Sequence, residues 1–256
     1  MIQNIYFIPM SSNLIFRQLF DRTSCTYTYI LGDAKTREAI IIDSVVEQNA
    51  RDFAILERLN LKPILALETH CHADHVTGVN GFKQKGVKIG IYKSNFKDGN
   101  KYYDIYFDDG DSFKFGSFEL KVIYTPGHTD DSCTFHLPLA GEPDKLFTGD
   151  TILITKCGRT DFQSGSSDSL YDSVTKKLFA FPEDTEVWPG HDYTGQTMST
   201  IAEEKKYNIR LNTTISREKF IDIMKNLNLA RPKKIDIAVP ANLTAGTKIP
   251  EVTSTS

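Results

Sequence analysis

Three of the six histidines of this chain fall within the stretch 70–75, which reads HCHADH and also holds the carboxylate of Asp74. Imidazole nitrogens and carboxylate oxygens are common metal ligands in proteins. The stretch directly follows an apolar run, and a loop that leaves a buried strand is held firmly at its root, so closely spaced ligands can converge on one point. A surface turn that is rich in histidine by chance is the weaker interpretation. The stretch therefore predicts a metal site.

Two more histidines and an aspartate occur in similar contexts later in the chain. His128 and His191 each end a Pro-Gly-His turn, and Asp150 follows an expected strand and a glycine. Proline and glycine fix a tight bend, which can aim one side chain back over the end of a sheet. Each of these turns alone would be ordinary. Together with 70–75 they predict one site shared by four strand-end loops.

The remaining candidates have structural interpretations. His136 lies inside an expected strand, and we therefore interpret it as a structural histidine. Cys71 lies among the expected ligands, but no separate base and oxyanion arrangement accompanies it. We expect a buried thiol at this position and not a nucleophile.

The elements that must position these residues are short strands with helices between and after them. Helices are expected at 50–59, after a cap at Ser166 or Ser167, and after Ser216, where apolar residues recur at helical spacing. Two stacked sheets with helices outside suit this order. The expected strands are 27–31, 39–42, 64–67, 87–91, 118–124, 133–137 and 145–147.

The length and charge of the chain limit the function classes. A chain of 256 residues that is 40% hydrophobic can close one substantial core. We expect one catalytic domain over 1–241 and a loose tail over 242–256, which is rich in Thr, Ser, Gly and Pro. The net charge of −3 provides no strong field for nucleic acid or an anionic membrane, so we expect a small-molecule substrate.

The cysteines and the N-terminus predict the compartment. The four cysteines stand singly, without a C-x-x-C pair, which favours a reducing environment. Residues 1–7 show neither a signal peptide nor a transit peptide pattern, and no apolar run could span a bilayer. We therefore expect a cytoplasmic protein without a membrane anchor.

The run Thr69–His75, of the form T-H-x-H-x-D-H and followed in order by His128, Asp150 and His191, resembles the signature of the metallo-β-lactamase superfamily. The resemblance implies an α/β fold, an αββα sandwich of two mixed sheets flanked by helices, with the metal at one sheet edge. Two branches look close. Glyoxalase II hydrolyses glutathione thioesters with two metals, whereas the persulfide dioxygenases, also called sulfur dioxygenases, bind one iron.

Several stretches resemble the persulfide dioxygenases more than glyoxalase II. In particular, 69–75 lacks the tryptophan that is typical of glyoxalase II before the aspartate. The stretch CGRTDFQ lacks the more aromatic and acidic continuation of glyoxalase II. The stretches with this likeness are 24–29, 69–75, 157–163, 226–229 and 238–242.

The resemblance implies a non-haem iron(II) enzyme with one Fe(II) per chain. His70, His128 and Asp150 would hold the iron and leave positions open for a persulfide sulfur and dioxygen. The remaining histidines and the aspartate of the motif would form a hydrogen-bonded layer around these ligands. The complete set of motif residues would also suit a dinuclear hydrolase. This supporting layer is expected to contain His72, Asp74, His75, His191 and, as a hydroxyl donor, Tyr193.

The implied reaction oxidises glutathione persulfide with O₂ and water to sulfite and glutathione. Arg159, with Thr160 and Asp161 beside it, is the first candidate for contact with a glutathione carboxylate, and Arg210 is the second. The resemblance leaves open a homodimer and a separate rhodanese-type sulfurtransferase as partners.

Two other function classes are weaker. A non-catalytic metal-binding relative is disfavoured because it would not need every ligand position, whereas this chain keeps the complete ligand set. A nuclease is disfavoured because the chain has no basic stripe.

Overall fold

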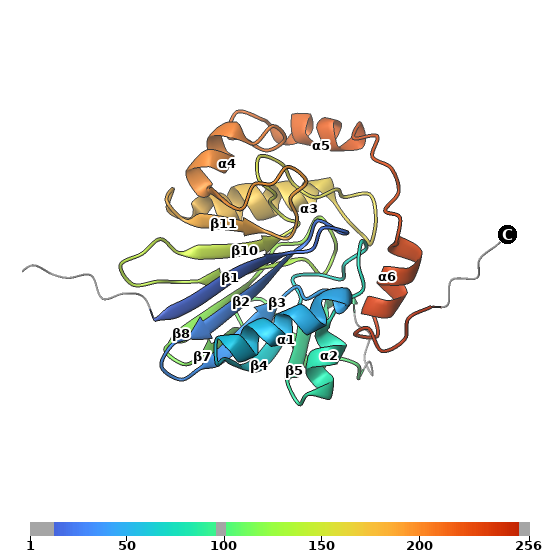
Figure 1. Ribbon diagram of the computed structural model, residues 1–256. Coiled ribbons are helices and arrows are strands. Elements are labelled where there is room, and N and C mark those ends of the chain that lie inside the picture. The colour runs from blue at the N-terminus through green and yellow to red at the C-terminus, as the bar shows by residue number, and fades with distance from the viewer. Residues whose placement is uncertain (1–12, 96–100, 251–256) are drawn as a thin grey trace, which may run out of the picture.

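Two six-stranded β-sheets lie face to face in the computed structural model, which describes residues 13–95 and 101–250 (Figure 1). This confirms the expected fold of two mixed sheets flanked by helices. The first sheet has the order β1 (Leu14–Phe20), β2 (Tyr27–Asp33), β3 (Glu38–Ile42), β4 (Lys62–Leu67), β5 (Lys88–Tyr92), β6 (Ile105–Phe107). The second has the order β12 (Ser199–Thr200), β11 (Glu186–Pro189), β10 (Lys145–Gly149), β9 (Cys133–Leu137), β8 (Phe118–Tyr124), β7 (Ser112–Phe115).

Helices cover the outer face of each sheet, as Figure 1 shows. Against the first sheet pack α1 (Asn49–Arg58), α2 (Val79–Gln84) and the end of α6 (Ile235–Asn242). Against the second pack α3 (Ser167–Asp172), α4 (Ile201–Tyr207) and α5 (Arg217–Lys225). Short helical turns complete the path at η1 (Val46–Gln48), η2 (Lys93–Asn95), η3 (Ser173–Lys177) and η4 (Leu178–Ala180).

Because both faces of the first sheet are covered, its central strands are apolar without a break. Ile40 and Ile42 of β3 point into the layer between the sheets, whereas Ile41 points to the helices. The second sheet follows the same rule, with Phe147 facing inward and Leu146 facing the helices. The period of two therefore divides each buried strand between two cores.

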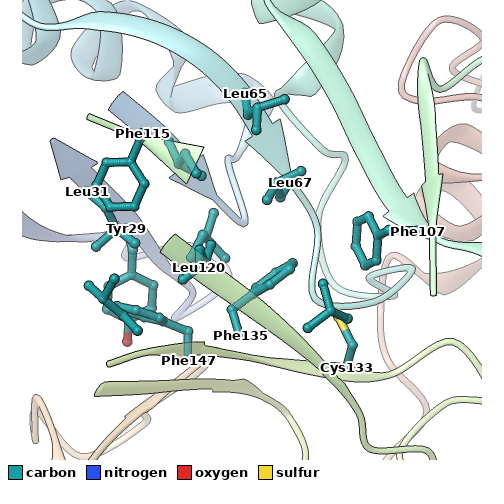
Figure 2. Packing of buried hydrophobic residues seen from close by; sticks show 14 of the residues in the cluster. Tyr29, Leu31, Leu65, Leu67, Phe107, Phe115, Leu120, Cys133, Phe135 and Phe147 are labelled. Carbon is teal, nitrogen blue, oxygen red and sulfur yellow. The ribbon is translucent and has the colours of Figure 1, made fainter. Parts of the chain in front are cut away.

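The layer between the sheets is rich in aromatic rings. Figure 2 shows Tyr29 of the first sheet beside Phe147 of the second, and their ring centroids lie 4.9 Å apart at 60°. Phe107 and Phe135 make the same kind of contact across the layer at 5.6 Å. Such edge-to-face pairs stabilise a core beyond the area that they bury, by about 0.5–1.5 kcal/mol each. They fix the position of the two sheets relative to each other.

The carboxylate of Asp33 joins turns from both sheets. It accepts hydrogen bonds from the Lys35 and Thr36 amides in its own turn, at 2.6 and 2.9 Å. It also accepts from the amide and the hydroxyl of Ser117, between β7 and β8, at 2.9 and 2.6 Å. Burial works to raise the pKa of Asp33, but these bonds hold it well below the ordinary value.

Two helices begin at serine caps that the sequence predicts. Ser166, and not Ser167, caps α3 by accepting from the Ser169 amide, and Ser216 caps α5 by accepting from the Lys219 amide. His136 hydrogen-bonds to Asp144 at 2.8 Å and packs edge-on against Phe181, as expected for a structural residue. Within 13–95 and 101–250, no helix is both long and apolar enough to cross a bilayer.

The predicted loose tail from 242 needs a correction. Asn242 and Ala245 are buried, and the Gly246 amide donates to the Ala241 carbonyl at 2.8 Å. Small and polar residues misled the prediction because here they pack and hydrogen-bond against other loops. Packed chain therefore continues past 241, while 251–256 lie outside the described residues, as do 1–12 with the N-terminal segment considered above.

Candidate metal centre

The expected ligands all follow strands that end near one edge of the two sheets. β10 is parallel to β11 and antiparallel to β9, which is antiparallel to β8, so β8, β10 and β11 run the same way. His128, Asp150 and His191 follow these three strands, and His70 follows β4 of the first sheet. The structure thus brings loops from both sheets to one place.

His70, His128 and Asp150 come together as a group of three. Each offers one ligand atom, and these atoms all lie within 4.8 Å of one another. His128 Nε2 lies 3.5 Å from Asp150 Oδ2. This separation leaves room for an ion between the side chains, because metal–nitrogen and metal–oxygen bonds are about 2.0–2.2 Å long.

Hydrogen bonds fix which nitrogen of His70 can bind a metal. The Thr69 hydroxyl donates its one proton to the Asp43 carboxylate at 2.8 Å. The Thr69 oxygen must therefore accept from His70 Nδ1, which lies 3.0 Å away. Nε2 of His70 is left with an exposed lone pair, and burial followed by nearby histidines lowers the pKa of His70 well below its usual value.

The same argument applies to His128. Its Nδ1 lies 2.6 Å from the carbonyl oxygen of Arg159, which can only accept. Nδ1 is therefore protonated, and in the neutral ring the lone pair of Nε2 faces Asp150. Two imidazole lone pairs and one carboxylate oxygen point together, and they repel one another unless a cation lies between them. The donor set fits a divalent transition metal.

Asp150 has a different partner for each carboxylate oxygen. Oδ2 faces His128, whereas Oδ1 lies 2.6 Å from Nδ1 of His191. Burial works to raise the pKa of Asp150, but the charge and hydrogen bond of His191 hold it well below the ordinary value. The carboxylate is therefore ionised and available as a ligand.

Gly149 lets the loop before Asp150 pass close to the His70 loop. Its φ is +50°, which side chains rarely adopt. An added Cβ would also lie 2.5 Å from the Thr69 hydroxyl. This explains the glycine directly before the expected ligand.

A second polar group lies beside the first and is joined by Thr26. Asp74 Oδ2 lies 2.9 Å from His75 Nδ1 and 3.0 Å from His191 Nε2. The buried Thr26 hydroxyl lies 3.1 Å from the same Asp74 oxygen and 3.0 Å from His191 Nε2. The structure therefore places Asp74, His75 and His191 in one hydrogen-bonded network that reaches Asp150.

His72 turns toward two buried carboxylates. Its Nε2 lies 3.2 Å from Asp43 Oδ1 and 3.1 Å from Glu68 Oε2. Burial works to lower the pKa of His72, but Asp43 and Glu68 raise it well above the usual value. His72 also packs on His70, with ring centroids 4.1 Å apart.

The comparisons with known proteins agree with this geometry. A family model described as the metallo-beta-lactamase superfamily matches residues 22–191. The human protein "Persulfide dioxygenase ETHE1, mitochondrial" is 44% identical over 198 residues, which cover 77% of this chain and 76% of the relative. The chain belongs to the persulfide dioxygenase family of the metallo-β-lactamase superfamily.

A solved structure and a more distant relative show similarity to both branches of the superfamily. A crystal structure of ETHE1 from Myxococcus xanthus matches with a TM-score of 0.84 at 45% identity, covering 91% of this chain and 99% of that one. Glyoxylase B2 from Dictyostelium discoideum is 32% identical over 221 residues, covering 72% of this chain and 74% of the relative. The expected relationship to both branches of the superfamily is confirmed.

In this member of the persulfide dioxygenase family, Arg159, the first predicted substrate contact, already has partners within the protein. Its guanidinium donates to the Asp161 carboxylate at 2.6 and 2.8 Å and to the Ala230 carbonyl at 2.7 Å. The Thr160 hydroxyl pairs with Ser167 at 2.7 Å. These bonds hold protein segments together, and substrate contact by Arg159, Thr160 or Asp161 stays a prediction.

Tyr193, predicted as a supporting hydroxyl donor, and Arg210, the second substrate candidate, lie nearer the surface. Tyr193 is 69% exposed, and its ring stacks parallel to His191 with centroids 6.1 Å apart. A small depression beside it is lined by residues 153–156, 191–194 and 196. Half-buried Arg210 donates to the Cys157 carbonyl at 2.6 Å, so one side of its guanidinium is already used.

The cysteines next to the metal centre are buried thiols. Burial raises the pKa of Cys71 well above its ordinary value and that of Cys157 to about 12. This agrees with a structural Cys71 and argues against a thiolate nucleophile.

Sequence reasoning missed Thr26, Asp43 and Glu68. Asp43 and Glu68 directly follow buried strands β3 and β4, which is the same signal that identified Asp150. Thr26 precedes a strand, and nothing in its type or spacing marks it out.

Proposed function

We propose that this chain is an iron-dependent persulfide dioxygenase that acts on glutathione persulfide. One observation carries the proposal: His70, His128 and Asp150 direct two imidazole lone pairs and one carboxylate oxygen at a common point. Two nitrogens and one carboxylate on one face of an ion are the ligand set of non-haem iron(II) oxygenases. Strong similarity to the human persulfide dioxygenase supports the same reaction.

The proposed reaction converts glutathione persulfide, O₂ and water into glutathione, sulfite and two protons. The terminal sulfur loses four electrons and leaves as sulfite, while O₂ accepts them and the S–S bond breaks. Water supplies the third oxygen of sulfite. A bound iron(II) supplies the one-electron chemistry that lets O₂ react with a persulfide.

The protein's own residues keep the ligands ready for the ion. Thr69 and the Arg159 carbonyl hold a proton on Nδ1 of His70 and His128, respectively. His191 holds one oxygen of Asp150 and so limits that carboxylate to a single free oxygen. Partners of this kind typically change metal affinity by about 10–100-fold.

We place the glutathione part of the substrate over the depression beside Tyr193. Lys156 lines this depression together with His191 and Tyr193, and its positively charged ammonium can pair with a glutathione carboxylate. Arg210 stays the second candidate, since its guanidinium is only partly used. Tyr193 is exposed, and its ring stacks on His191 of the centre.

Hydrolysis of a glutathione thioester is the second candidate function. Atoms of His72, Asp74 and His75 also lie within 4.8 Å of one another, and Nε2 of His75 is buried without a hydrogen-bond partner. A second ion there would make a dinuclear hydrolase. The Thr26 network argues for hydrogen bonds at this place instead.

Iron content and sulfite formation test the proposal. Iron-loaded protein given glutathione persulfide should form sulfite and hold one iron per chain. The variant Asp150→Ala should lose both, whereas Asp144→Ala, which removes the partner of the structural His136, should keep both. A chain that holds iron but forms no sulfite would refute the proposed activity.

The compartment and partners stay predictions. A reducing, cytoplasmic location fits the four cysteines, which are all free, although the human and mouse relatives are named mitochondrial. A homodimer and a separate rhodanese-type sulfurtransferase are proposals that size measurement and pull-down with purified sulfurtransferase would test.

A further inference from the structure

The chain between 229 and 246, here called the C-terminal segment, touches two loops of the metal centre. In Figure 1 it descends along the right-hand side of the molecule from α5, at the top, to α6, which is drawn above and to the right of α2. At its start, the Ala230 carbonyl accepts from Arg159, whose own carbonyl orients His128. Near its end, Asn242 contacts the loop that follows His70.

Asn242 uses its whole side-chain amide on the backbone of that loop. Its Nδ2 donates to the carbonyls of His72 and His75, at 2.8 and 2.9 Å. Its Oδ1 accepts from the amide of Thr77 at 2.8 Å. The side chain is buried, with only 2% of the residue exposed.

These bonds hold a stretch that has no helix or strand of its own. Residues 70–76 lie between β4 and α2, and few backbone bonds within the loop fix their path. Each bond to Asn242 satisfies a backbone group that is costly to leave buried and unpaired. Removing the amide therefore frees the loop backbone at both ends of the Asp74 segment.

A chain of contacts leads from this loop to an expected ligand. Asp74 lies 3.0 Å from Nε2 of His191, and Nδ1 of His191 lies 2.6 Å from Oδ1 of Asp150. On the other side of the loop, the His72 ring packs on His70. A shift of the loop would therefore disturb Asp150 and His70 together.

We propose that Asn242 is a positioning residue of the metal centre, which sets metal affinity by holding the loop 72–77. The inference rests on the proposed function only for the role of the metal, and its test needs no persulfide. Two further contacts hold Asn242 itself: the Tyr103 hydroxyl donates to its carbonyl at 2.9 Å, and the Ala245 amide donates to the same oxygen at 3.0 Å.

Asn208 provides a matched control. It is also a buried asparagine, and its side chain donates to the Lys156 carbonyl at 2.9 Å and accepts from the Leu211 amide at 3.0 Å. It has no hydrogen bond to His70, His128, Asp150 or the 72–77 loop. Replacing either asparagine with alanine should lower thermal stability by a similar amount, which separates stability from positioning.

The experiment is a cobalt(II) titration of the metal-free chain in competition with a chelator, with the visible spectrum recorded. Asn242→Ala should weaken cobalt binding by about tenfold and change the d–d bands. Asn208→Ala should bind within twofold of the unmodified chain with the same spectrum. If Asn242→Ala does not fold, Asn242→Asp, which keeps Oδ1 but opposes two carbonyls with a second oxygen, provides the same comparison.

Cobalt affinity and spectrum of an Asn242 variant that match those of Asn208→Ala would overturn the proposal. It would also be overturned if both Asn242 variants fail to fold while Asn208→Ala folds, since Asn242 would then be a residue of the fold alone. Failure of the proposed function looks different. In that case cobalt binds normally to the unmodified chain and more weakly to the Asn242 variants, but the iron-loaded enzyme forms no sulfite.

Discussion

At the scale of single residues, the metal centre depends on where protons are held. His70 and His128 each have one nitrogen occupied by a neighbour that can only accept, so each keeps the other nitrogen free. The ionised Asp150 completes the set because His191 stabilises its charge. The centre is thus pre-formed by hydrogen bonds in the protein.

Thr69 is the residue that most directly tests this account. Thr69→Val keeps the shape but removes the acceptor for Nδ1 of His70, so the ring can adopt the wrong tautomer. We expect metal affinity to fall by about 10–100-fold, measured by competition with a chelator. Thr175→Val, whose hydroxyl donates to the Tyr171 carbonyl of its own helical segment, should bind as before. Equal affinity in the two variants would disprove the tautomer argument.

Lys156 tests the placement of the substrate. Lys156→Met keeps most of the apolar stem but removes the charge, so KM for glutathione persulfide should rise by about tenfold, equivalent to about 1.4 kcal/mol, with kcat little changed. Lys176→Met, at an exposed lysine paired with Asp172, is the control. An unchanged KM would mean that Lys156 does not bind the glutathione carboxylate, and Arg210 would be the next candidate.

The sequence indicated the three grouped residues of the candidate metal centre better than the residues that hydrogen-bond around them. His70, His128 and Asp150 could be found because rare residue types follow strands at fixed turns. Thr26 and Asn242 could not, because threonine and asparagine are common and their contacts join parts of the chain that are far apart. The partners of Arg159 could not be predicted either, because its acceptors, Asp161 and the Ala230 carbonyl, are brought to it only by the folded chain.

At the scale of elements, the expected strands were found because both faces of each central strand are covered. Strand β1 was not predicted, since its half-buried residues mix apolar side chains with Arg17 and Gln18. Helix α6 was also not predicted, because Pro240 lies inside it and the following residues resemble a tail. Tertiary packing, and not local propensity, decides such elements.

Asp33 provides a pH test of how the sheets are joined. Its pKa is lower in the folded protein than the unfolded value of about 3.9. It therefore stabilises the fold fully above about pH 4, and this contribution is lost as the pH falls toward the folded pKa. Asp33→Asn should cost about 1.5–3 kcal/mol in urea unfolding at pH 7. The difference from the unmodified chain should shrink below pH 4, and a constant difference would contradict this role.

At the scale of the whole molecule, the metal centre joins the two halves of the sandwich. The first sheet and His70 come from residues 14–107, whereas the second sheet and the other expected ligands come from 112–200. An ion held by both halves binds only the folded protein and must stabilise it. The packed chain then continues past 241 to close the loop after His70 through Asn242.

Metal binding should therefore raise thermal stability. Free metal at 100 times its Kd adds about 2.7 kcal/mol, which corresponds to roughly 5–10 °C in Tm for a chain of this size. Differential scanning calorimetry with and without a chelator measures the shift. Asp150→Ala should show almost none. A similar shift in that variant would mean that the stabilising ion binds elsewhere.

Oxygen uptake by the iron-loaded chain is the most direct test of the proposed activity. With glutathione persulfide in an oxygen electrode, one O₂ should be consumed for each sulfite formed, and a glutathione thioester given in parallel should remain intact. Cleavage of the thioester without oxygen uptake in either sample would contradict the dioxygenase and identify a hydrolase.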